Sequence, residues 1–336
     1  MTQIKVDTIA DAAGTGAADF ADGITIAGGA LSALNTAEYY SSASEPTSPK
    51  NGAIWWDTAN ETVMVYIAGE FKEVELGAAA GGGWTVDLAN ATYDSVSFSV
   101  VSQESNATAL TLSSDGTKMY VGGNTSDKIY QYSLSTAFDL STASYDSVSL
   151  ASDSIQELYI STDGTKLFWT NLTTVYQYSL STAFDLSTAS YDSVSKSVSS
   201  QESVVRALAF NDDGTKMYVA GSGNDTVYQY ALSTAFDLST ASYASVSFSV
   251  SSVGIPYGIR FNTDGTKMYI QGSTSDQIYQ YSLSTGFDVS TASSDGVTFA
   301  VTQALSPESL TFSADGTKMY VLDANLDTVF QYSTGL

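Results

Sequence analysis

From residue 84 onward, short runs of apolar residues recur along the chain and are separated by polar turns. The apolar run 109–112 is followed by an Asp-Gly turn and a second run, 118–121. A third run, 128–133, and a long polar connection lead to a fourth, of which 95–100 is the first example. The fourth run alternates with period two, as a strand with one wet face does. Each unit therefore predicts four short β-strands.

A repeat of about fifty residues organises these strands. The tetrapeptide Asp-Gly-Thr-Lys occurs five times at intervals of 48 to 51 residues, with its aspartates at Asp115, Asp163, Asp213, Asp264 and Asp315. Glycine at the turn permits the positive φ that a tight hairpin needs. An aromatic residue and a motif such as Ile-Tyr-Gln-Tyr at 129–132 follow each copy. Four antiparallel strands per repeat of this length are typical of a β-propeller blade.

The order of the strands at the two ends of the repeat region predicts a closed ring. Strands of the fourth kind are expected to begin near Ser95, Ser147, Ser193, Ser245 and Gly296. The region opens with a lone fourth strand and stops after a third strand at Tyr332. A ring needs this offset because the first strand can complete the last blade and leave no open edge. We expect an all-β chain with a five-bladed β-propeller closed by an N-terminal strand; the alternative is a linear β-solenoid fibre.

The region before the repeats predicts a small β-rich module. Three short strands are expected at 53–57, 62–66 and 71–74. A meander of this size gains stability by assembling with copies of itself or with a partner. The predicted organisation is an attachment segment at 1–45, a small β-meander at 46–76, a Gly/Ala linker at 77–83 and the propeller at 84–336.

Composition excludes several functions. Twelve basic and 36 acidic residues give a formal charge of −24, which repels nucleic acid and anionic membranes. The chain has no Cys and no His, so disulfides, thiolate chemistry, the Ser–His–Asp triad and imidazole zinc sites are excluded. The sequence contains no run of about 18 apolar residues, so no membrane helix is expected. Residues 1–7 lack the apolar core of a secretory signal. We expect no enzyme activity, no metal and no cofactor.

The repeat resembles the lactonase-like (YVTN-type) propeller family, whose blades carry a Ser-x-Asp-Gly turn followed by a hydrophobic residue and Tyr. Residues 114–120, Ser-Asp-Gly-Thr-Lys-Met-Tyr, match that pattern. The resemblance covers about three quarters of the chain and implies the fold rather than an activity. The turn differs from the sialidase Asp-box, which has a residue between Asp and Gly.

Two N-terminal stretches resemble tail-fibre and appendage proteins of tailed marine phages. The first runs from Ile4 to Gly16 and continues through Asp19-Phe20 and Gly23-Ile24. The second, Pro-Thr-Ser-Pro-Lys-Asn-Gly-Ala-Ile-Trp-Trp-Asp at 46–57, precedes Val65-Tyr66. The resemblance implies a virion location, contacts with other tail or capsid proteins through residues 1–83, and a homo-oligomer such as a trimer.

Two repeated features allow either a binding or a structural interpretation. The turn lysines Lys118, Lys166, Lys216, Lys267 and Lys318 form either an anion-binding ring or a set of solvated hairpin residues. The turn aspartates supply one carboxylate per turn, too few for calcium, which takes about six to eight oxygens. Tyr130 and Tyr132 share one sheet face and are expected to pack on the neighbouring blade.

The connections between a fourth strand and the next first strand differ among copies whose other parts barely change. In a propeller these loops gather at one mouth of the central channel. They supply or closely precede the candidate ligand-binding residues Arg206, Arg260, Tyr257, Glu104, Glu202 and Glu308. Arg and Tyr anchor polar ligands well. The alternative is drift, with both arginines paired to acids such as Glu202 and Glu308 and the channel sealed.

The function expected from these features is that of a structural protein of a bacteriophage virion, a tail fibre or tail-associated appendage. Its propeller would project outward for host attachment, with a host-surface glycan or receptor as ligand. Three alternatives remain: a passive capsid or tail decoration protein, a glycan-acting enzyme or lactonase, and a bacterial adhesin. Carboxylate pairs can hydrolyse glycosides without His, whereas an adhesin would normally carry a secretion signal.

Overall fold

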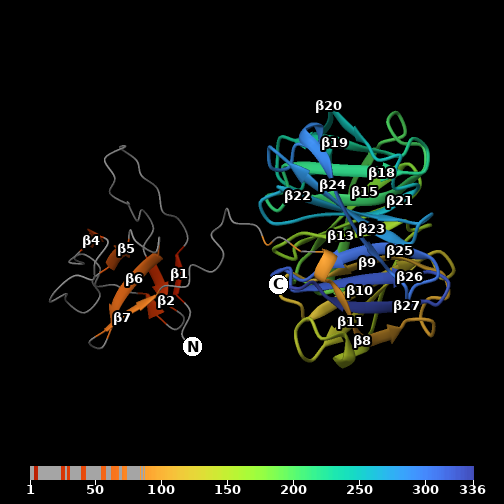
Figure 1. Ribbon diagram of the computed structural model, residues 1–336. Coiled ribbons are helices and arrows are strands. Elements are labelled where there is room, and N and C mark those ends of the chain that lie inside the picture. The colour runs from red at the N-terminus through yellow and green to blue at the C-terminus, as the bar shows by residue number, and fades with distance from the viewer. Residues whose placement is uncertain are drawn as a thin grey trace. The chain divides into compact units, whose positions relative to one another are not determined.

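The computed structural model describes Trp84, Val86 and residues 88–336, together with the backbone of seven short strands that precede them. The chain divides into two compact units, Met1–Gly83 and Trp84–Leu336 (Figure 1). Within the described residues, no helix is both long enough and apolar enough to cross a membrane.

The first unit contains two small sheets. One is three-stranded and antiparallel, with β1 (Ile4–Val6), β2 (Ile24–Ile26) and β3 (Gly29–Ala30). The other contains β4 (Tyr39–Ser42), β5 (Ile54–Asp57), β6 (Thr62–Ile67) and β7 (Glu70–Glu73), with β4 parallel to β5. The strands β5 to β7 correspond to the three strands expected between residues 53 and 74. The rest of the predicted attachment segment and the linker at 77–83 lie outside the described residues.

The second unit consists of five four-stranded antiparallel sheets, the blades. Blade 1 contains β9 (Ala107–Leu112), β10 (Lys118–Gly123), β11 (Lys128–Leu134) and β12 (Ala143–Ala151). Blade 2 contains β13 (Glu157–Ile160), β14 (Lys166–Thr170), β15 (Thr174–Leu180) and β16 (Ala189–Ser197). Blade 3 contains β17 (Val205–Phe210), β18 (Lys216–Gly221), β19 (Thr226–Leu232) and β20 (Ala241–Ser249).

Blade 4 contains β21 (Pro256–Phe261), β22 (Lys267–Gly272), β23 (Gln277–Leu283) and β24 (Ala292–Ala300). Blade 5 combines β25 (Pro307–Phe312), β26 (Lys318–Asp323) and β27 (Thr328–Ser333) with β8 (Thr92–Ser99) from the other end of the unit. Single 3-10 turns precede the fourth strands: η2 (Leu88–Asn90), η3 (Leu140–Thr142), η4 (Leu186–Thr188), η5 (Leu238–Thr240) and η6 (Val289–Thr291).

Pairing of β8 with β27 closes the ring, as the order of the strands predicts. The two strands are antiparallel, with Phe98 opposite Val329 and Tyr93 opposite Tyr332. In Figure 1 the orange β8 lies beside the blue β27. The inner strands contact one another in succession around the ring, including β25 with β9. The second unit is therefore a closed propeller and not a linear solenoid.

The fourth strands begin earlier than expected. The prediction placed their first residues near Ser95, Ser147, Ser193, Ser245 and Gly296, but the strands start three or four residues before these positions. Each of these residues instead has a positive φ, of 57 to 70°, in the middle of its strand. At Ser147 the pairing shifts register, so that Gln131 faces Val148 while Tyr132 faces Tyr145. The apparent strand start is thus a β-bulge, which adds one or more unpaired residues to the outer strand.

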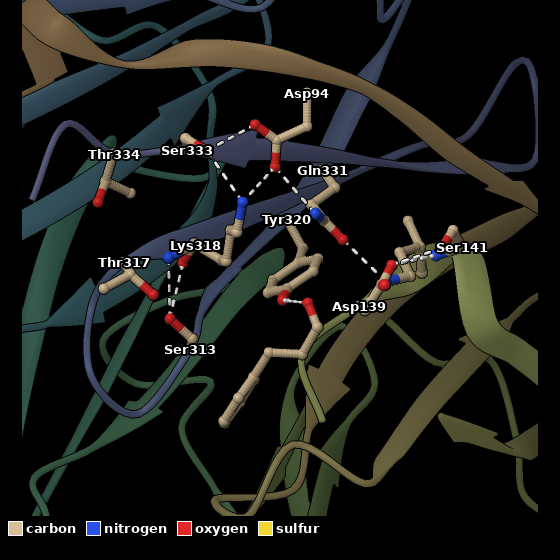
Figure 2. A network of polar contacts seen from close by, with 12 residues as sticks. Asp94, Asp139, Ser141, Ser313, Thr317, Lys318, Tyr320, Gln331, Ser333 and Thr334 are labelled. Atoms are coloured by element: carbon tan, nitrogen blue, oxygen red, sulfur yellow. Dashed lines mark hydrogen bonds and ion pairs between the residues drawn. The ribbon is translucent and has the colours of Figure 1, made fainter. Parts of the chain in front are cut away.

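In every blade but blade 3, the bulge positions a carboxylate for a network that ties the outer strand to its blade. In blade 5, Asp94 Oδ2 accepts hydrogen bonds from Lys318 Nζ at 2.7 Å and Gln331 Nε2 at 2.8 Å, and Oδ1 accepts from Ser333 Oγ at 2.6 Å (Figure 2). Gln331 Oε1 accepts the backbone N–H of Leu140 in η3 at 2.8 Å. The network therefore joins β8 to blade 5 and blade 5 to blade 1.

Aromatic residues fill the space between blades. Tyr132 of blade 1 is fully buried, and its ring meets Phe98 of blade 5 edge-on at 5.5 Å. Phe299 of blade 4 meets Tyr332 of blade 5 in the same way. Edge-on aromatic pairs of this kind are favourable beyond the area that they bury. The expected packing of the third-strand tyrosines on a neighbouring blade is confirmed at these positions.

Candidate functional site

The first strand of each blade lines the centre of the ring. Because β9, β13, β17, β21 and β25 are edge strands of their sheets, one side of each backbone has no partner within its blade. Buried backbone N–H and C=O groups require hydrogen-bond partners. The side chains that supply those partners determine whether the channel is open.

Arg260 in β21 supplies hydrogen-bond donors to three backbone carbonyl groups in the channel. Its Nη1 donates to the carbonyl oxygens of Leu208 at 3.2 Å and Ile259 at 2.8 Å, and its Nη2 donates to that of Leu110 at 3.3 Å. Leu110 and Arg260 belong to blades that are not neighbours, so the side chain crosses the middle of the ring. Only 8% of Arg260 is exposed. The structure thus places Arg260 inside the channel rather than at the loops.

Glu157 and Ser309 complete this central network from two further blades. Glu157 is fully buried, and its Oε1 lies 3.9 Å from Arg260 Nη2. Ser309 Oγ lies 3.1 Å from both carboxylate oxygens of Glu157 and 3.1 Å from the backbone nitrogen of Leu110. Burial raises the pKa of Glu157 to about 8, because desolvation outweighs the attraction of Arg260. We call Arg260, Glu157 and Ser309 the central plug.

β-Bulges at one repeat position release side chains at the end of the channel near the fourth-to-first loops, which we call the loop-side mouth. The ladder between the first and second strands skips a residue in four blades. The skipped residues are Thr108, Arg206, Tyr257 and Glu308. Gln156 occupies the equivalent place before β13. A bulge frees a side chain from the alternation of the strand and redirects it. This repeat position carries a different side chain in each of the five blades, and Thr108 and Gln156 are buried there.

Arg206 connects this group. Its Nη1 donates to Gln156 Oε1, and its guanidinium carbon lies 5.3 Å from the centre of the Tyr257 ring. A guanidinium over an aromatic face is attracted by the ring quadrupole. The Nε of Arg206 is buried and has no hydrogen-bond partner among the described residues. Arg206 thus holds two neighbouring side chains and retains one free donor.

Glu308 adds a carboxyl group of altered acidity to the same mouth. Burial raises its pKa to about 7, with Asp323 contributing in the same direction and Arg206 opposing the shift. The pKa of the Tyr257 hydroxyl is also raised, by burial and by the charge of Glu308, while Arg206 lowers it. The structure therefore brings together three of the six predicted residues, Arg206, Tyr257 and Glu308.

Glu104 and Glu202 hold the loops together. Glu104 Oε1 accepts the backbone N–H groups of Asn106 and Thr125, both at 3.0 Å, and Oε2 accepts that of Ser126 at 3.1 Å. In blade 3, Glu202 Oε1 accepts those of Val204 at 2.8 Å and Gly223 at 2.9 Å. These carboxylates join the fourth-to-first loop to the loop between the second and third strands. Their recorded contacts are with their own blades rather than with the arginines.

The repeated turn residues have structural partners. Four of the five turn lysines form ion pairs of 2.7 to 2.9 Å with an aspartate in the fourth strand. Lys216 is the exception, because Ala244 stands where the other four blades have Asp. Lys216 Nζ instead donates to the carbonyl oxygen of Phe287 at 3.0 Å. Asp115 accepts from Thr117 and Ser113 within its own turn. These partners support the structural interpretation of the turns over an anion-binding ring.

The pattern of residues places the loop 151–157 at the channel mouth but does not single out Gln156 or Glu157 as candidate site residues. A signal was available, since the five sequences at 107–112, 155–160, 205–210, 256–261 and 307–312 align by the repeat and differ mainly at polar positions. In the part of the chain that the structure describes, no group of three or more His, Cys, Asp or Glu side chains could hold a metal ion.

Comparison with known proteins shows limited similarity. No protein-family profile and no curated protein matches the chain. A solved structure from Bacteroides uniformis, provisionally assigned as a 6-phosphogluconolactonase, is 13% identical with a TM-score of 0.42, and the match covers 64% of this chain and 63% of that one. A protein of unknown function from Desulfotomaculum acetoxidans is 14% identical with a TM-score of 0.42, over 65% of this chain and 62% of that one.

A protein from Lactobacillus plantarum is 17% identical with a TM-score of 0.40, over 65% of this chain and 64% of that one. The chain thus spans less than two thirds of each of these structures. Identities of this size carry no information about a shared activity. The class established by the strand pairing itself is a closed five-bladed β-propeller.

Proposed function

We propose that the chain is a virion appendage protein of a tailed phage, in which residues 1–83 attach to the particle and the propeller binds a ligand on the host surface at its loop-side mouth. The N-terminal resemblance to phage tail fibres supports the attachment role. The observation that carries the binding role is the ring of five different side chains at one position of an otherwise repeated scaffold.

The chemistry of this mouth suits a polar ligand with negative charge. Arg206 has a free buried donor and a positive charge on a chain whose formal charge is −24. Tyr257 provides a rigid aromatic face beside it. Glu308, with a pKa of about 7, can accept or donate a hydrogen bond at neutral pH. An acidic glycan or receptor segment would find here a positive charge beside an aromatic face, on a protein whose net charge is strongly negative.

The chain enters the propeller at the end opposite to the loop-side mouth. Trp84 packs on the turn of blade 5, where its ring would meet a Cβ added at Gly316. That turn lies at the end of the blade opposite to the fourth-to-first loops. Within the propeller, the entry point and the loop-side mouth are therefore on different faces.

Incorporation into particles tests the attachment role. A chain that starts at Trp84 should fold, because it retains all strands of the propeller, but it should be absent from purified virions when co-expressed during infection. The full chain serves as control and should be incorporated. Detection of the shortened chain in particles at the level of the full chain would overturn the assignment of residues 1–83.

Binding of the purified full chain to host cells tests the recognition role. We expect Arg206→Ala and Tyr257→Ala to weaken binding by about tenfold or more, since each removes a contact at the centre of the site. Lys128→Ala is the matched control, because it removes an exposed positive charge from the same face outside the mouth. Equal binding by wild type and Arg206→Ala would refute the proposal, whereas equal loss in Lys128→Ala would indicate nonspecific charge attraction.

A further inference from the structure

A cavity opens at the other end of the channel, beside the Asp-Gly-Thr-Lys turns, which we call the turn-side mouth. Its volume is about 170 Å³, and all five blades contribute to its lining. Aromatic side chains form much of the wall, among them Tyr159, Phe210 and Phe312. Arg260 borders it from the central plug, and Asp212 stands among hydroxyl groups of the turns. Apolar walls with a few placed polar groups are characteristic of small-molecule sites.

Blade 3 departs from the repeat at this cavity. At the position of Ala209 the other blades carry the larger side chains Thr111, Tyr159, Arg260 and Thr311. At the position of Asp212 they carry Ser114, Thr162, Thr263 and Ala314. One substitution reduces the bulk of the lining and the other introduces a charge. Neither follows from the needs of the blade, since four blades fold with other residues there.

Asp212 places a carboxylate at the rim of the cavity. It is exposed at the rim, and no hydrogen bond to its carboxylate is recorded among the described residues. The neighbouring turn aspartate, Asp213, by contrast accepts from Asn211 and Thr215. Partial desolvation raises the pKa of Asp212 to about 6, and the charge of Asp213 adds to the shift. The pKa of Tyr159 is raised by burial and by Asp212 and lowered by Arg260, so its hydroxyl is within electrostatic reach of both charges.

We propose that this cavity binds a single neutral sugar ring. Such a ligand both donates and accepts hydrogen bonds, which matches a lining that offers a carboxylate and several hydroxyl groups. Its C–H faces fit against aromatic walls, and a volume of about 170 Å³ accommodates one pyranose ring. An anion would face Asp212, and a cation would face Arg260. The inference does not depend on the proposed function, which concerns the opposite mouth.

Saturation-transfer NMR on the full chain tests this proposal with glucose, galactose, mannose and N-acetylglucosamine as probes. Tetramethylammonium and methyl phosphate, whose methyl protons saturation transfer can detect, represent the competing cationic and anionic ligand classes. We expect transfer to at least one sugar and to neither ion. Asp212→Ala should weaken that sugar's affinity by about tenfold, because it removes a charged hydrogen-bond acceptor from the rim. Ala209→Met should abolish binding by filling the cavity.

Two control variants and one folding control make the outcome decisive. Asp153→Asn removes an exposed negative charge on the loop side, and Arg206→Ala alters the other mouth; neither should change sugar binding. If Ala209→Met fails to show a cooperative melt, Asp212→Ala at the exposed rim decides alone. The proposal is overturned if no sugar in the panel gives transfer, if an ion binds instead, or if Asp212→Ala binds the sugar as wild type does.

Discussion

Asp94 and Lys318 form an ion pair of 2.7 Å although 224 positions separate them in the chain. In blade 1 the equivalent pair, Lys118 and Asp146, has the same geometry within one continuous repeat. The ring is therefore closed by the same Lys–Asp interaction that holds the outer strand in blades 1, 2 and 4. Closure needed no special sequence beyond a repeat that begins one strand out of phase.

Removal of the closing strand should open the ring. A chain that starts at Ser102 lacks β8 and leaves β27 as an exposed edge with Val329 and Tyr332 uncovered. We expect loss of the single cooperative transition seen by circular dichroism and increased binding of a hydrophobic dye. A chain that starts at Trp84 is the control. Identical melting of the two shortened chains would contradict the closure mechanism.

Restoring the missing aspartate of blade 3 should stabilise the propeller. Ala244→Asp places a carboxylate where the other blades hold one, within reach of Lys216 and Gln229. An ion pair between partly exposed side chains contributes up to about 1 kcal/mol, which corresponds to a rise of up to about 2–4 °C in melting temperature for a domain of this size. Ala244→Asn, which can accept a hydrogen bond but carries no charge, should give a smaller rise. A lower melting temperature for Ala244→Asp would show that blade 3 is held differently.

Loss of the central guanidinium should destabilise the fold rather than merely empty the channel. Arg260→Ala leaves the Glu157 carboxyl group and the carbonyls of Leu208 and Leu110 without their partner. Leaving a buried hydrogen-bonding group without its partner costs about 1–3 kcal/mol. Arg206→Ala, at the half-buried mouth, should cost far less. Equal stability of the two variants in urea denaturation would contradict the central plug.

The buried carboxyl group predicts a particular pH dependence of stability. The pKa of Glu157 in the folded protein, about 8, exceeds the ordinary value of 4.5, so the folded state retains a proton that the unfolded state loses between these values. Stability therefore falls as pH rises through this window, by at most about 1.4 kcal/mol per pH unit for one group. Glu157→Gln should lack this contribution. If the free energy of unfolding of wild type and of Glu157→Gln changed with pH in the same way between pH 5 and 8, this assignment of the pH dependence to Glu157 would be refuted.

Counting repeats was sufficient to predict the blades and their closure, because both follow from motif spacing and from the strand left over at one end. The position of the bulge was not predictable in this way. Ser147 fits an alternating strand by its polarity, and only its positive φ shows that pairing is interrupted there. The bulge in turn explains why Asp146 reaches Lys118, a contact that a regular ladder would not suggest.

The sequence does not show how far along the channel each residue of a first strand lies, and this limited the prediction of the channel residues. Arg206 and Arg260 both follow a divergent loop, but Arg206 is a bulge residue at the mouth and Arg260 lies deep in β21. The charge of a residue does not show which partner it meets, so Glu104 appeared available although backbone N–H groups occupy its carboxylate. At the turn-side mouth, Ala209 and Asp212 differ from the residues at the same repeat positions in the other blades, and this difference is visible in the sequence. The sequence does not show that both residues line one cavity.

Adsorption of particles to host cells tests the central claim most directly, that the loop-side mouth of a virion-borne propeller recognises the host. The rate constant would be measured for particles carrying wild-type chain, Arg206→Ala or the control Lys128→Ala, at equal incorporation of the protein. The account predicts adsorption about tenfold slower for Arg206→Ala and an unchanged rate for Lys128→Ala. Equal rates for all three particles would contradict it.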